Sequence, residues 1–469
     1  MDVVNGEITG ACHVVAIPYP GRGHVNPMMN LCKLLVSKLG DVIKITFVVT
    51  EEWLGFIESA PRPPQIQLRS IPNVIPSELV RALDFAGFID AVYTNMEAPI
   101  EQLLDQMESP ATAIIADTYM PLAVSIGNRR NIPVVSLWTM SPSVFSVFYH
   151  FDLLTQNLHI PVDLSERGDE LIDYIPGISP TCLADMPTIF NGTGQKVLGR
   201  VLEAFSLVRK AQCLLLTSFH ELDAQVADTL RPILPFPVYS VGPSIPYTTF
   251  LHETDQKPSS ATANGNSNMV DYFKWLDSQP KSSVLYVSLG SFLSVSKEQM
   301  DEILAGLRDS GVRYLLVSRG DASREQEAFG EMSKVVTWCD QLRVLCHSSV
   351  GGFWTHCGWN STLEGVFAGV PMLTFPIFFD QIPNRKQIVD DWKVGMKVKK
   401  EVGAEELVKR EEIAMIVKRF MDLDGDESKE MRRRASELKE SCRQALAKGG
   451  SSDTNLNAFI RSILQCHGH

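Results

Sequence analysis

One run of 44 residues, from Trp338 to Gln381, concentrates side chains that suit a phosphorylated, sugar-bearing ligand. The run opens with an aromatic residue that could stack on a planar base, and it closes with a carboxylate and an amide that could orient sugar hydroxyls. Between them, a glycine-containing turn precedes a helical pattern. The N–H groups and the positive dipole at a helix N-terminus favour a phosphate there. Together these features predict a site for a nucleotide sugar.

The same residues also have structural interpretations. Ser361 and Glu364 fit the S-x-x-E capping box of a helix. Trp338 follows a short apolar strand and could fill a hydrophobic core, and Asp380 could cap the next helix. For Glu364 and Trp338 taken singly, the structural interpretation is the stronger one. It does not explain why the same turn also contains His356, Gly358, Trp359 and Asn360.

A second candidate group lies outside this run, near the N-terminus. The turn G-R-G-H-V-N resembles the dinucleotide fingerprint G-x-G-x-x-G, but Asn26 replaces the third glycine, so the match is weak. His24 lies in this turn, and Asp117 ends a later strand. If the two side chains meet, the carboxylate fixes the imidazole tautomer and stabilises its cation. His24 would then be a competent general base near neutral pH. The alternative is a structural histidine.

Apolar strands and helical patterns alternate along the chain, which indicates parallel sheets built from βα units. Asn26 as N-cap and Pro27 in the first turn predict a helix over Pro27–Leu39. Strands are expected at residues 12–20, 43–49, 113–117, 132–138, 283–290, 312–318, 350–354 and 370–376.

A chain of 469 residues exceeds one compact core, so two domains are expected. The predicted fold is α/β, with two Rossmann-like βαβ domains that face each other across a cleft. The first spans 1–248, a linker or loop spans 249–268, and the second spans 269–451. A helix at 452–469 packs back on the first domain. Ligands in such sheets bind beyond the carboxyl ends of the strands.

Composition excludes several classes of protein. The net charge of −12 argues against a nucleic-acid surface, which needs clustered Lys and Arg. No signal peptide and no run of about 18 apolar residues is visible, so no transmembrane segment is expected. Nine cysteines without a framework spacing indicate reduced thiols and a cytoplasmic protein. The Cys and His residues between 339 and 357 lack a C-x2-4-C pair, so no metal site is predicted. A monomer is expected.

The run from Trp338 to Gln381 resembles the signature box of the plant family 1 UDP-dependent glycosyltransferases. The W-x-x-Q opening, H-C-G-W-N-S, the following Glu364 and the final D-Q match it. The G-H-x-N-P turn at 23–27 and the S-L-G-S turn at 288–291 also match. The resemblance extends over the whole chain. It implies the GT-B fold, in which two Rossmann-like domains face each other.

The resemblance also implies roles for individual residues. His24 is implied to be the base and Asp117 its partner. Trp338 is implied to stack on uracil, and Glu364 to hold the ribose. The residues implied to bind UDP are Ser291, Trp338, Cys339, Gln341, His356, Gly358, Trp359, Asn360, Ser361 and Glu364. Those implied to contact the sugar are Thr139, Trp359, Asp380 and Gln381. No cofactor or metal is implied, because the UDP-sugar is a co-substrate.

The implied activity is an inverting transfer of a hexose, in plant secondary metabolism, to a small lipophilic acceptor. Gln381 suggests glucose as the donor sugar, with a hydroxyl or carboxyl of a phenolic, flavonoid, terpenoid or hormone as acceptor. Residues that could line an acceptor pocket, or equally fill core, are Trp138, Phe145, Phe148, Tyr149 and Phe190. Two departures from the family pattern are the pair Cys339-Asp340, where Ala-Pro is usual, and Arg22 before the base.

Two alternatives remain open from the sequence. A nicotinamide-dependent oxidoreductase on twin Rossmann-like domains is one, although the broken fingerprint and the lack of an acid at 48–50 count against it. A non-catalytic UDP-sugar binder is the other, and the presence of both His24 and Asp117 weighs against it.

Overall fold

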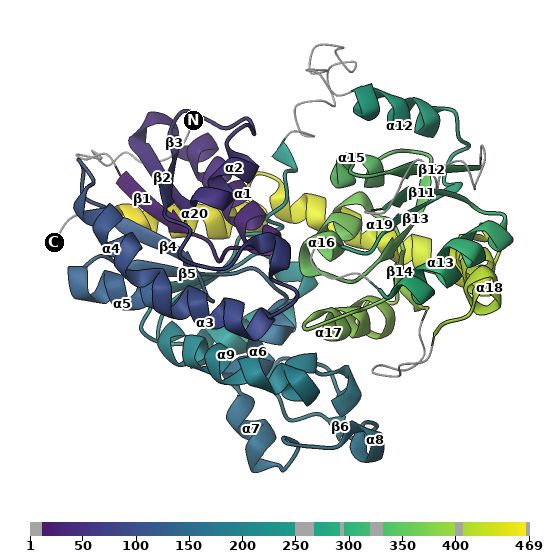
Figure 1. Cartoon of the computed structure of the whole chain (residues 1–469), viewed down its shortest axis with the longest axis horizontal. Helices are drawn as coiled ribbons and strands as arrows, with labels where there is room; N and C mark the ends of the chain where they lie inside the picture. The colour runs from purple at the N-terminus through teal and green to yellow at the C-terminus, as the bar shows by residue number, and fades with distance from the viewer. Residues whose placement is uncertain (1–11, 249–266, 291–294, 319–331, 399–406, 466–469) are drawn as a thin grey trace.

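The computed structural model describes residues 12–248, 267–290, 295–318, 332–398 and 407–465. Within these residues the chain forms two large sheets that lie side by side, each flanked by helices (Figure 1). The sheet built from the N-terminal part of the chain is called the first sheet below, and the other is the second sheet. The expected α/β class with two Rossmann-like sheets is confirmed.

The first sheet has the strand order β3-β2-β1-β4-β5-β8-β9, and all its neighbours are parallel. β1 pairs with both β2 and β4, so the strand order reverses direction between β1 and β4. In doubly wound sheets ligands bind at this switch point. The strands are β1 Cys12–Ile17, β2 Ile43–Thr50, β3 Ile66–Ile71, β4 Ala113–Asp117, β5 Val134–Trp138, β8 Cys213–Leu216 and β9 Val238–Ser240.

The second sheet repeats this topology with the order β12-β11-β10-β13-β14-β15, again all parallel. Its switch point lies between β10 and β13, the strands that precede Gly290 and His356. The strands are β10 Val284–Ser288, β11 Arg313–Val317, β12 Ser333–Val336, β13 Val350–Thr355, β14 Met372–Thr374 and β15 Gly395–Lys397.

Helices cover both faces of each sheet, as crossover connections between parallel strands require. Those before residue 249 are α1 Arg22–Leu39, α2 Glu51–Ile57, α3 Phe85–Asn95, α4 Glu97–Asp105, α5 Pro121–Arg130, α6 Pro142–Tyr149, α7 Phe151–Gln156, α8 Leu164–Arg167, α9 Gln195–Val208 and α10 Ala224–Ile233. Those after it are α12 Ser267–Asp277, α13 Lys297–Ser310, α15 Gln341–Leu345, α16 Trp359–Ala368, α17 Gln381–Lys386, α18 Arg410–Met421, α19 Asp426–Leu446 and α20 Ser451–Gln465.

The strands beside the switch points are buried on both faces. In β1, Val15 and Ile17 belong to one hydrophobic cluster, and Val14 and Ala16 belong to the cluster on the opposite face. Alternation of side chains along a strand produces this division. A strand that is buried on both faces has a continuous run of apolar residues, and this run predicts the strand from the sequence.

Helix α1 begins earlier than predicted. It starts at Arg22 with Gly21 as N-cap, so the predicted cap at Asn26 and start at Pro27 are wrong. Pro27 lies inside the helix and has no N–H to donate to the Gly23 carbonyl four residues earlier. That carbonyl instead accepts a hydrogen bond from Asn360 Nδ2 at 3.0 Å. A partner from the other half of the chain therefore replaces the missing helical hydrogen bond.

The last described helix, α20, packs against β9 of the first sheet, and Figure 1 shows it beside the elements of that sheet. Phe459 and Ile460 are buried in the same cluster as strands β1 and β2, and Asn455 Nδ2 donates to the Ser240 carbonyl at 3.1 Å. Most of the predicted linker, residues 249–266, and the chain end, residues 466–469, lie outside the described residues. None of the helices in the described part of the chain is long and apolar enough to cross a bilayer.

Candidate active site

His24, Asp117 and Thr139 meet at the switch point of the first sheet. His24 Nδ1 lies 2.8 Å from Asp117 Oδ2 and 2.8 Å from Thr139 Oγ1. Thr139 Oγ1 also donates to Asp117 Oδ2 at 3.2 Å. Because a carboxylate can only accept, Nδ1 carries the imidazole proton, and Nε2 keeps a lone pair. The predicted encounter of His24 and Asp117 is therefore present in the structure.

Parallel strands explain why these residues converge. Asp117 is the last residue of β4, and Thr139 follows the last residue of β5, which pairs with β4. His24 lies in the first turn of α1, after the neighbouring strand β1. The Asp117 side chain is 1% exposed and that of His24 is 19% exposed. The carboxylate is thus sealed inside, while the imidazole reaches the surface.

Helix α16 begins in the turn after β13, at the switch point of the second sheet. Its N-cap is Gly358, and no side chain caps the helix. The capping-box interpretation of Ser361 and Glu364 is therefore wrong, and the N–H groups of the first turn can bind an anion. Gly358 and Gly290 lie against the His356 ring, because a Cβ on either would approach His356 Nε2 to 2.5 or 2.7 Å.

A hydrogen-bonded chain joins Gln341 to the helix α16. Gln341 Nε2 donates to Ser361 Oγ at 2.9 Å and to Glu364 Oε2 at 2.5 Å. The Tyr286 hydroxyl donates to Gln341 Oε1 at 3.1 Å. Burial raises the pKa of Glu364 to about 7, although the hydrogen bond from Gln341 opposes the shift. Tyr286 was not predicted from sequence, since it lies inside the ordinary apolar pattern of β10.

Trp338 is 59% exposed, so the interpretation of this residue as core is wrong. Its neighbour Cys339 is buried beside the Tyr286 hydroxyl, at 3.4 Å. The Asp340 side chain caps α15 by accepting from the Arg343 backbone N–H at 3.2 Å. The unusual Cys-Asp pair is therefore a buried thiol followed by a helix cap. An exposed indole ring can stack on a flat base.

The Trp359 indole lies in the core and not at the surface. The residue is 3% exposed, and its ring centroid is 6.3 Å from that of Trp392. The indole Nε1 is buried and has no hydrogen-bond partner among the described residues. The sugar contact implied for Trp359 stays a prediction.

Asp380 and Gln381 are held by contacts within their own loop. Asp380 Oδ2 accepts from Asn384 Nδ2 at 2.9 Å, and burial raises the pKa of Asp380 to about 6. Gln381 Oε1 accepts from the N–H groups of Ile377 and Phe378, at 2.7 and 3.0 Å. Asp380 makes no side-chain cap to α17. Asn384 also donates to the Cys357 carbonyl at 2.9 Å and so ties this loop to the α16 turn.

Several other residues named from the sequence make none of these contacts or lie outside the described residues. Arg22 is exposed at the first position of α1. Four of the five residues considered for an acceptor pocket are fully buried core, namely Trp138, Phe145, Phe148 and Phe190, and Tyr149 is half-buried. Ser291 lies outside the described residues. Within the described residues, no group of three or more His, Cys, Asp or Glu side chains is placed to hold a metal ion.

Comparison with known proteins identifies the family. Residues 101–413 match the family model described as "UDP-glucoronosyl and UDP-glucosyl transferase". UDP-glycosyltransferase 87A2 of Arabidopsis thaliana is 53% identical over 453 residues, which cover 96% of each chain. The chain belongs to the plant UDP-glycosyltransferases. It is therefore a hexosyltransferase that uses a UDP-sugar, and the oxidoreductase and non-catalytic alternatives are wrong.

Solved structures confirm the GT-B fold of this glycosyltransferase. Medicago truncatula UGT71G1, complexed with UDP-glucose, is 26% identical with a TM-score of 0.81, over 97% of this chain and 98% of that one. Phytolacca americana UGT2, complexed with UDP-2fluoro-glucose and pterostilbene, is 26% identical with a TM-score of 0.79, over 97% of this chain and 100% of that one.

Polar contacts join the two halves of the glycosyltransferase next to Asp380. We call the contacts between segments 179–188 and 379–391 the seam. Thr188 and Phe379 exchange two hydrogen bonds, Phe379 N–H to Thr188 Oγ1 at 2.8 Å and Thr188 N–H to the Phe379 carbonyl at 3.2 Å. Arg385 forms an ion pair with Asp185, and both side chains are largely buried. Phe379 has a φ of +59°, a strained conformation that the seam must maintain.

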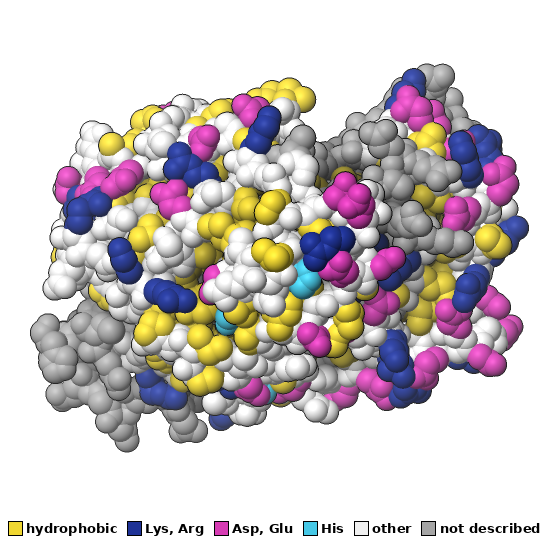
Figure 2. Space-filling model, turned by 90° about the horizontal axis from the view of Figure 1, so that it is seen from below, with side chains coloured by type: hydrophobic (Ala, Val, Ile, Leu, Met, Phe, Trp, Pro, Cys, Tyr) yellow, Lys and Arg dark blue, Asp and Glu magenta, His cyan; other side chains and the backbone are white. Residues whose placement is uncertain are grey.

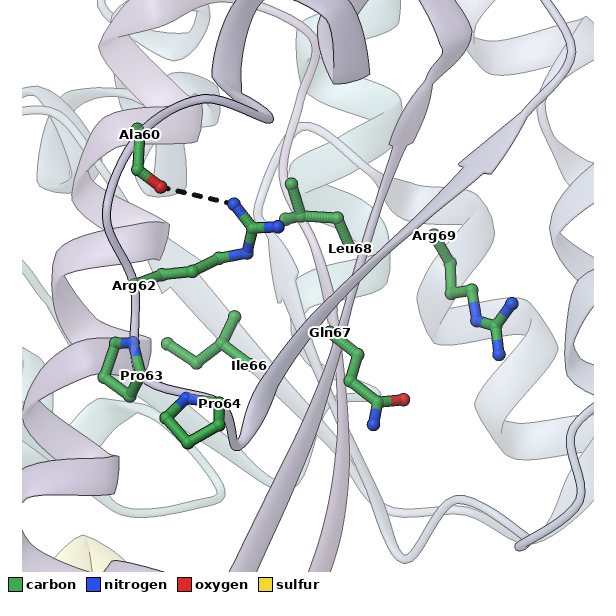
Figure 3. Close-up of a pocket in the computed structure, with 8 residues that line it drawn as sticks. All are labelled: Ala60, Arg62, Pro63, Pro64, Ile66, Gln67, Leu68 and Arg69. Atoms are coloured by element: carbon green, nitrogen blue, oxygen red, sulfur yellow. Dashed lines mark hydrogen bonds between the residues drawn. The ribbon is translucent and has the colours of Figure 1, made fainter.

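Surface features elsewhere do not form part of this site. On the face shown in Figure 2, hydrophobic side chains gather around the middle of the molecule, with a few charged side chains among them. A surface hollow of about 560 Å³ lies at the edge strand β3 (Figure 3), lined by Ala60, Arg62, Pro63, Pro64, Ile66, Gln67, Leu68 and Arg69. It adjoins the loop that enters β3, whereas Asp117 is the last residue of β4 and His24 lies in the turn after β1, at the opposite ends of the strands.

Replacing Arg385 with Met tests the seam. The change leaves Asp185 without its buried cation, and breaking such a pair costs about 3 kcal/mol. We expect a clearly lower denaturant midpoint for Arg385→Met, measured by fluorescence during urea unfolding. Arg433→Ala is the matched control, because its ion pairs with Glu430 and Glu437 are exposed and should contribute less than about 1 kcal/mol. Equal midpoints for the two variants would contradict a structural role for the seam.

Proposed function

We propose that this enzyme transfers glucose from UDP-glucose to a hydroxyl of a small aromatic acceptor, with inversion at the anomeric carbon. Residues 1–248 would form the acceptor side and residues 269–451 the donor side. The solved relatives support this assignment, since one is complexed with UDP-glucose and another with UDP-2fluoro-glucose and pterostilbene. The Gln381 at the end of the signature run supports glucose as the donor sugar.

One observation carries the proposal: the hydrogen bond between Asn360 Nδ2 and the Gly23 carbonyl. Gly23 adjoins His24, and Asn360 lies in the first turn of α16. The bond therefore places the proposed base next to the N-terminus of a helix that would hold the diphosphate. A base and a leaving group must be this close for one displacement to join acceptor and donor.

The donor would lie along the second sheet's switch point. The exposed indole of Trp338 would stack on the base, and the Glu364 carboxylate would accept hydrogen bonds from ribose hydroxyls. The first turn of α16, together with His356 and Ser361, would hold the diphosphate. Asp380 and Gln381 would contact the sugar hydroxyls, with Asn384 and the seam keeping their loop in place.

Proton transfer would proceed through His24. Its Nε2 lone pair would take the proton of the attacking hydroxyl while Asp117 stabilises the imidazolium that forms. The acceptor oxygen would then bond to the anomeric carbon as the bond to the UDP oxygen breaks. Negative charge grows on the diphosphate during this step, and the N–H groups of α16 would stabilise it. Attack opposite the leaving group inverts the anomeric configuration.

Replacing His24 with Ala tests the assigned base. We expect kcat for transfer to an alcohol or phenol to fall about 10²- to 10⁴-fold, the usual contribution of a positioned base. UDP-glucose affinity, measured by calorimetry, should change less than about twofold, because the donor residues remain intact. His220→Ala is the control, since His220 pairs with Asp228 at the surface. Loss of donor binding in His24→Ala would contradict the role.

Glu364 predicts a pH dependence of donor binding. Its pKa of about 7 means that the carboxylate is mostly protonated at pH 6 and mostly ionised at pH 8. The ionised form accepts two ribose hydroxyls, so UDP-glucose binding should strengthen as the pH rises. We expect the ratio of wild-type to Glu364→Gln affinity to grow about tenfold between pH 6 and pH 8. A ratio that is constant, or that falls with pH, would show that Glu364 does not hold the ribose.

A further inference from the structure

Two tyrosines, Tyr19 and Tyr119, lie against the ring of the proposed base, and a third, Tyr93, interacts with Tyr19 and Asp117. Tyr19 and Tyr119 each lie two residues beyond the end of a strand, β1 and β4 respectively, and Tyr93 lies on α3. The ring centroids of Tyr19 and Tyr119 are 5.0 and 6.0 Å from that of His24, and 6.3 Å from each other. β1 and β4 are parallel neighbours, so both residues after them reach the same edge of the sheet.

The hydroxyl groups of these tyrosines have no hydrogen-bond partner among the residues that the structure describes. The three residues are only 5%, 8% and 7% exposed, for Tyr19, Tyr93 and Tyr119, and each hydroxyl oxygen is buried without a partner. Buried hydroxyls are nearly always paired, because leaving one unpaired costs free energy. Three such groups near the proposed base and its partner Asp117 indicate that a ligand supplies the missing partners.

The surroundings of the hydroxyls are apolar and carry negative rather than positive charge. Aromatic rings contact the tyrosines: Phe88 at 6.2 Å from Tyr19, and Trp138 and Phe379 at 5.5 and 6.4 Å from Tyr119. Burial raises the pKa of Tyr93 and Tyr119 well above the usual value, and the Asp117 carboxylate adds to it. The hydroxyls therefore stay neutral.

The two cations near the tyrosines, Arg81 and Arg200, are both paired with acidic side chains. Arg81 forms an ion pair with Glu78 at 3.2 Å and donates to the Pro20 carbonyl at 3.1 Å. The Arg200 guanidinium lies 5.8 Å from the Tyr93 ring centroid and forms ion pairs with Asp90 and Glu203. Asp117 and Asp380 both act on Tyr119. An anionic acceptor such as a carboxylate is disfavoured here by like-charge repulsion.

We propose that Tyr19, Tyr93 and Tyr119 select a neutral aromatic acceptor that carries several oxygen groups, as a polyhydroxylated phenol does. This inference rests on the proposed glucosyl transfer and narrows its acceptor. One acceptor hydroxyl faces His24 Nε2, and the others pair with the tyrosine hydroxyls. An acceptor without these oxygens leaves the tyrosine hydroxyls buried and unpaired, which costs free energy. The site therefore favours acceptors that carry the oxygens over analogues that lack them.

The test compares two acceptors that share the reacting hydroxyl: 7-hydroxyflavone and 3′,4′,7-trihydroxyflavone. With UDP-glucose, we expect the wild-type enzyme to have at least about tenfold higher kcat/KM for the trihydroxy compound. The same kcat/KM values should be measured for three variants, Tyr93→Phe, Tyr19→Phe and Tyr119→Phe. Mass spectrometry and NMR of the products identify the hydroxyl that receives the glucose. In at least one variant, kcat/KM for the trihydroxy compound should fall about tenfold, mainly through a higher acceptor KM. The kcat/KM of the same variant for 7-hydroxyflavone should fall less than about twofold.

Two controls separate specificity from general damage. The KM for UDP-glucose should not change in the three variants. Tyr314→Phe removes a buried hydroxyl from β11 in the core of the second sheet. This variant should have the wild-type kcat/KM for both acceptors. Equal use of both acceptors by the wild-type enzyme, or equal losses on both in every variant, would overturn the proposal while leaving glucosyl transfer intact. Absence of transfer to either phenol would overturn the proposed function as well.

Discussion

The hydrogen bond between His24 Nδ1 and Asp117 Oδ2 is the interaction on which the proposed chemistry depends. It requires β1 and β4 to be parallel neighbours, because only then do the turn after one and the last residue of the other meet. Thr139, after β5, completes the arrangement from a third adjacent strand. Burial of the carboxylate keeps water from competing for the imidazole. The order of strands in the first sheet therefore determines where a base can lie.

The second constraint is that this base must face a donor bound by the other half of the chain. Pro27 cannot close its helical hydrogen bond, and the Gly23 carbonyl is satisfied by Asn360 from the start of α16. Because Pro27 leaves this carbonyl without a helical donor, the carbonyl can form a hydrogen bond between the two halves of the chain. The seam, with the Arg385–Asp185 pair, adds a second contact on the side of the sugar-binding loop. The Gly23 carbonyl adjoins His24, and the hydrogen bonds between Phe379 and Thr188 in the seam adjoin Asp380.

The sequence predicts what depends on local pattern and misses what depends on distant partners. Buried strands such as 113–117 were located because parallel strands are continuous apolar runs. The sequence misplaces the start of α1, because a proline usually lies in the first turn of a helix. Pro27 lies inside α1, where the Asn360 amide replaces the missing hydrogen bond. Tyr286 and Asn384 contribute single hydrogen bonds across long separations, which no spacing reveals. Sequence also cannot tell that the Trp359 ring is buried whereas the Trp338 ring is exposed.

The central claim is that one displacement joins acceptor and donor, with the base on one side of the sugar and the diphosphate on the other. The anomeric configuration of the product tests this most directly. NMR of the glucoside formed from UDP-glucose, whose sugar is α-linked, should show the large coupling between H1 and H2 of a β-glucoside. A small coupling, characteristic of an α-glucoside, would mean retention and would contradict a direct displacement assisted by His24.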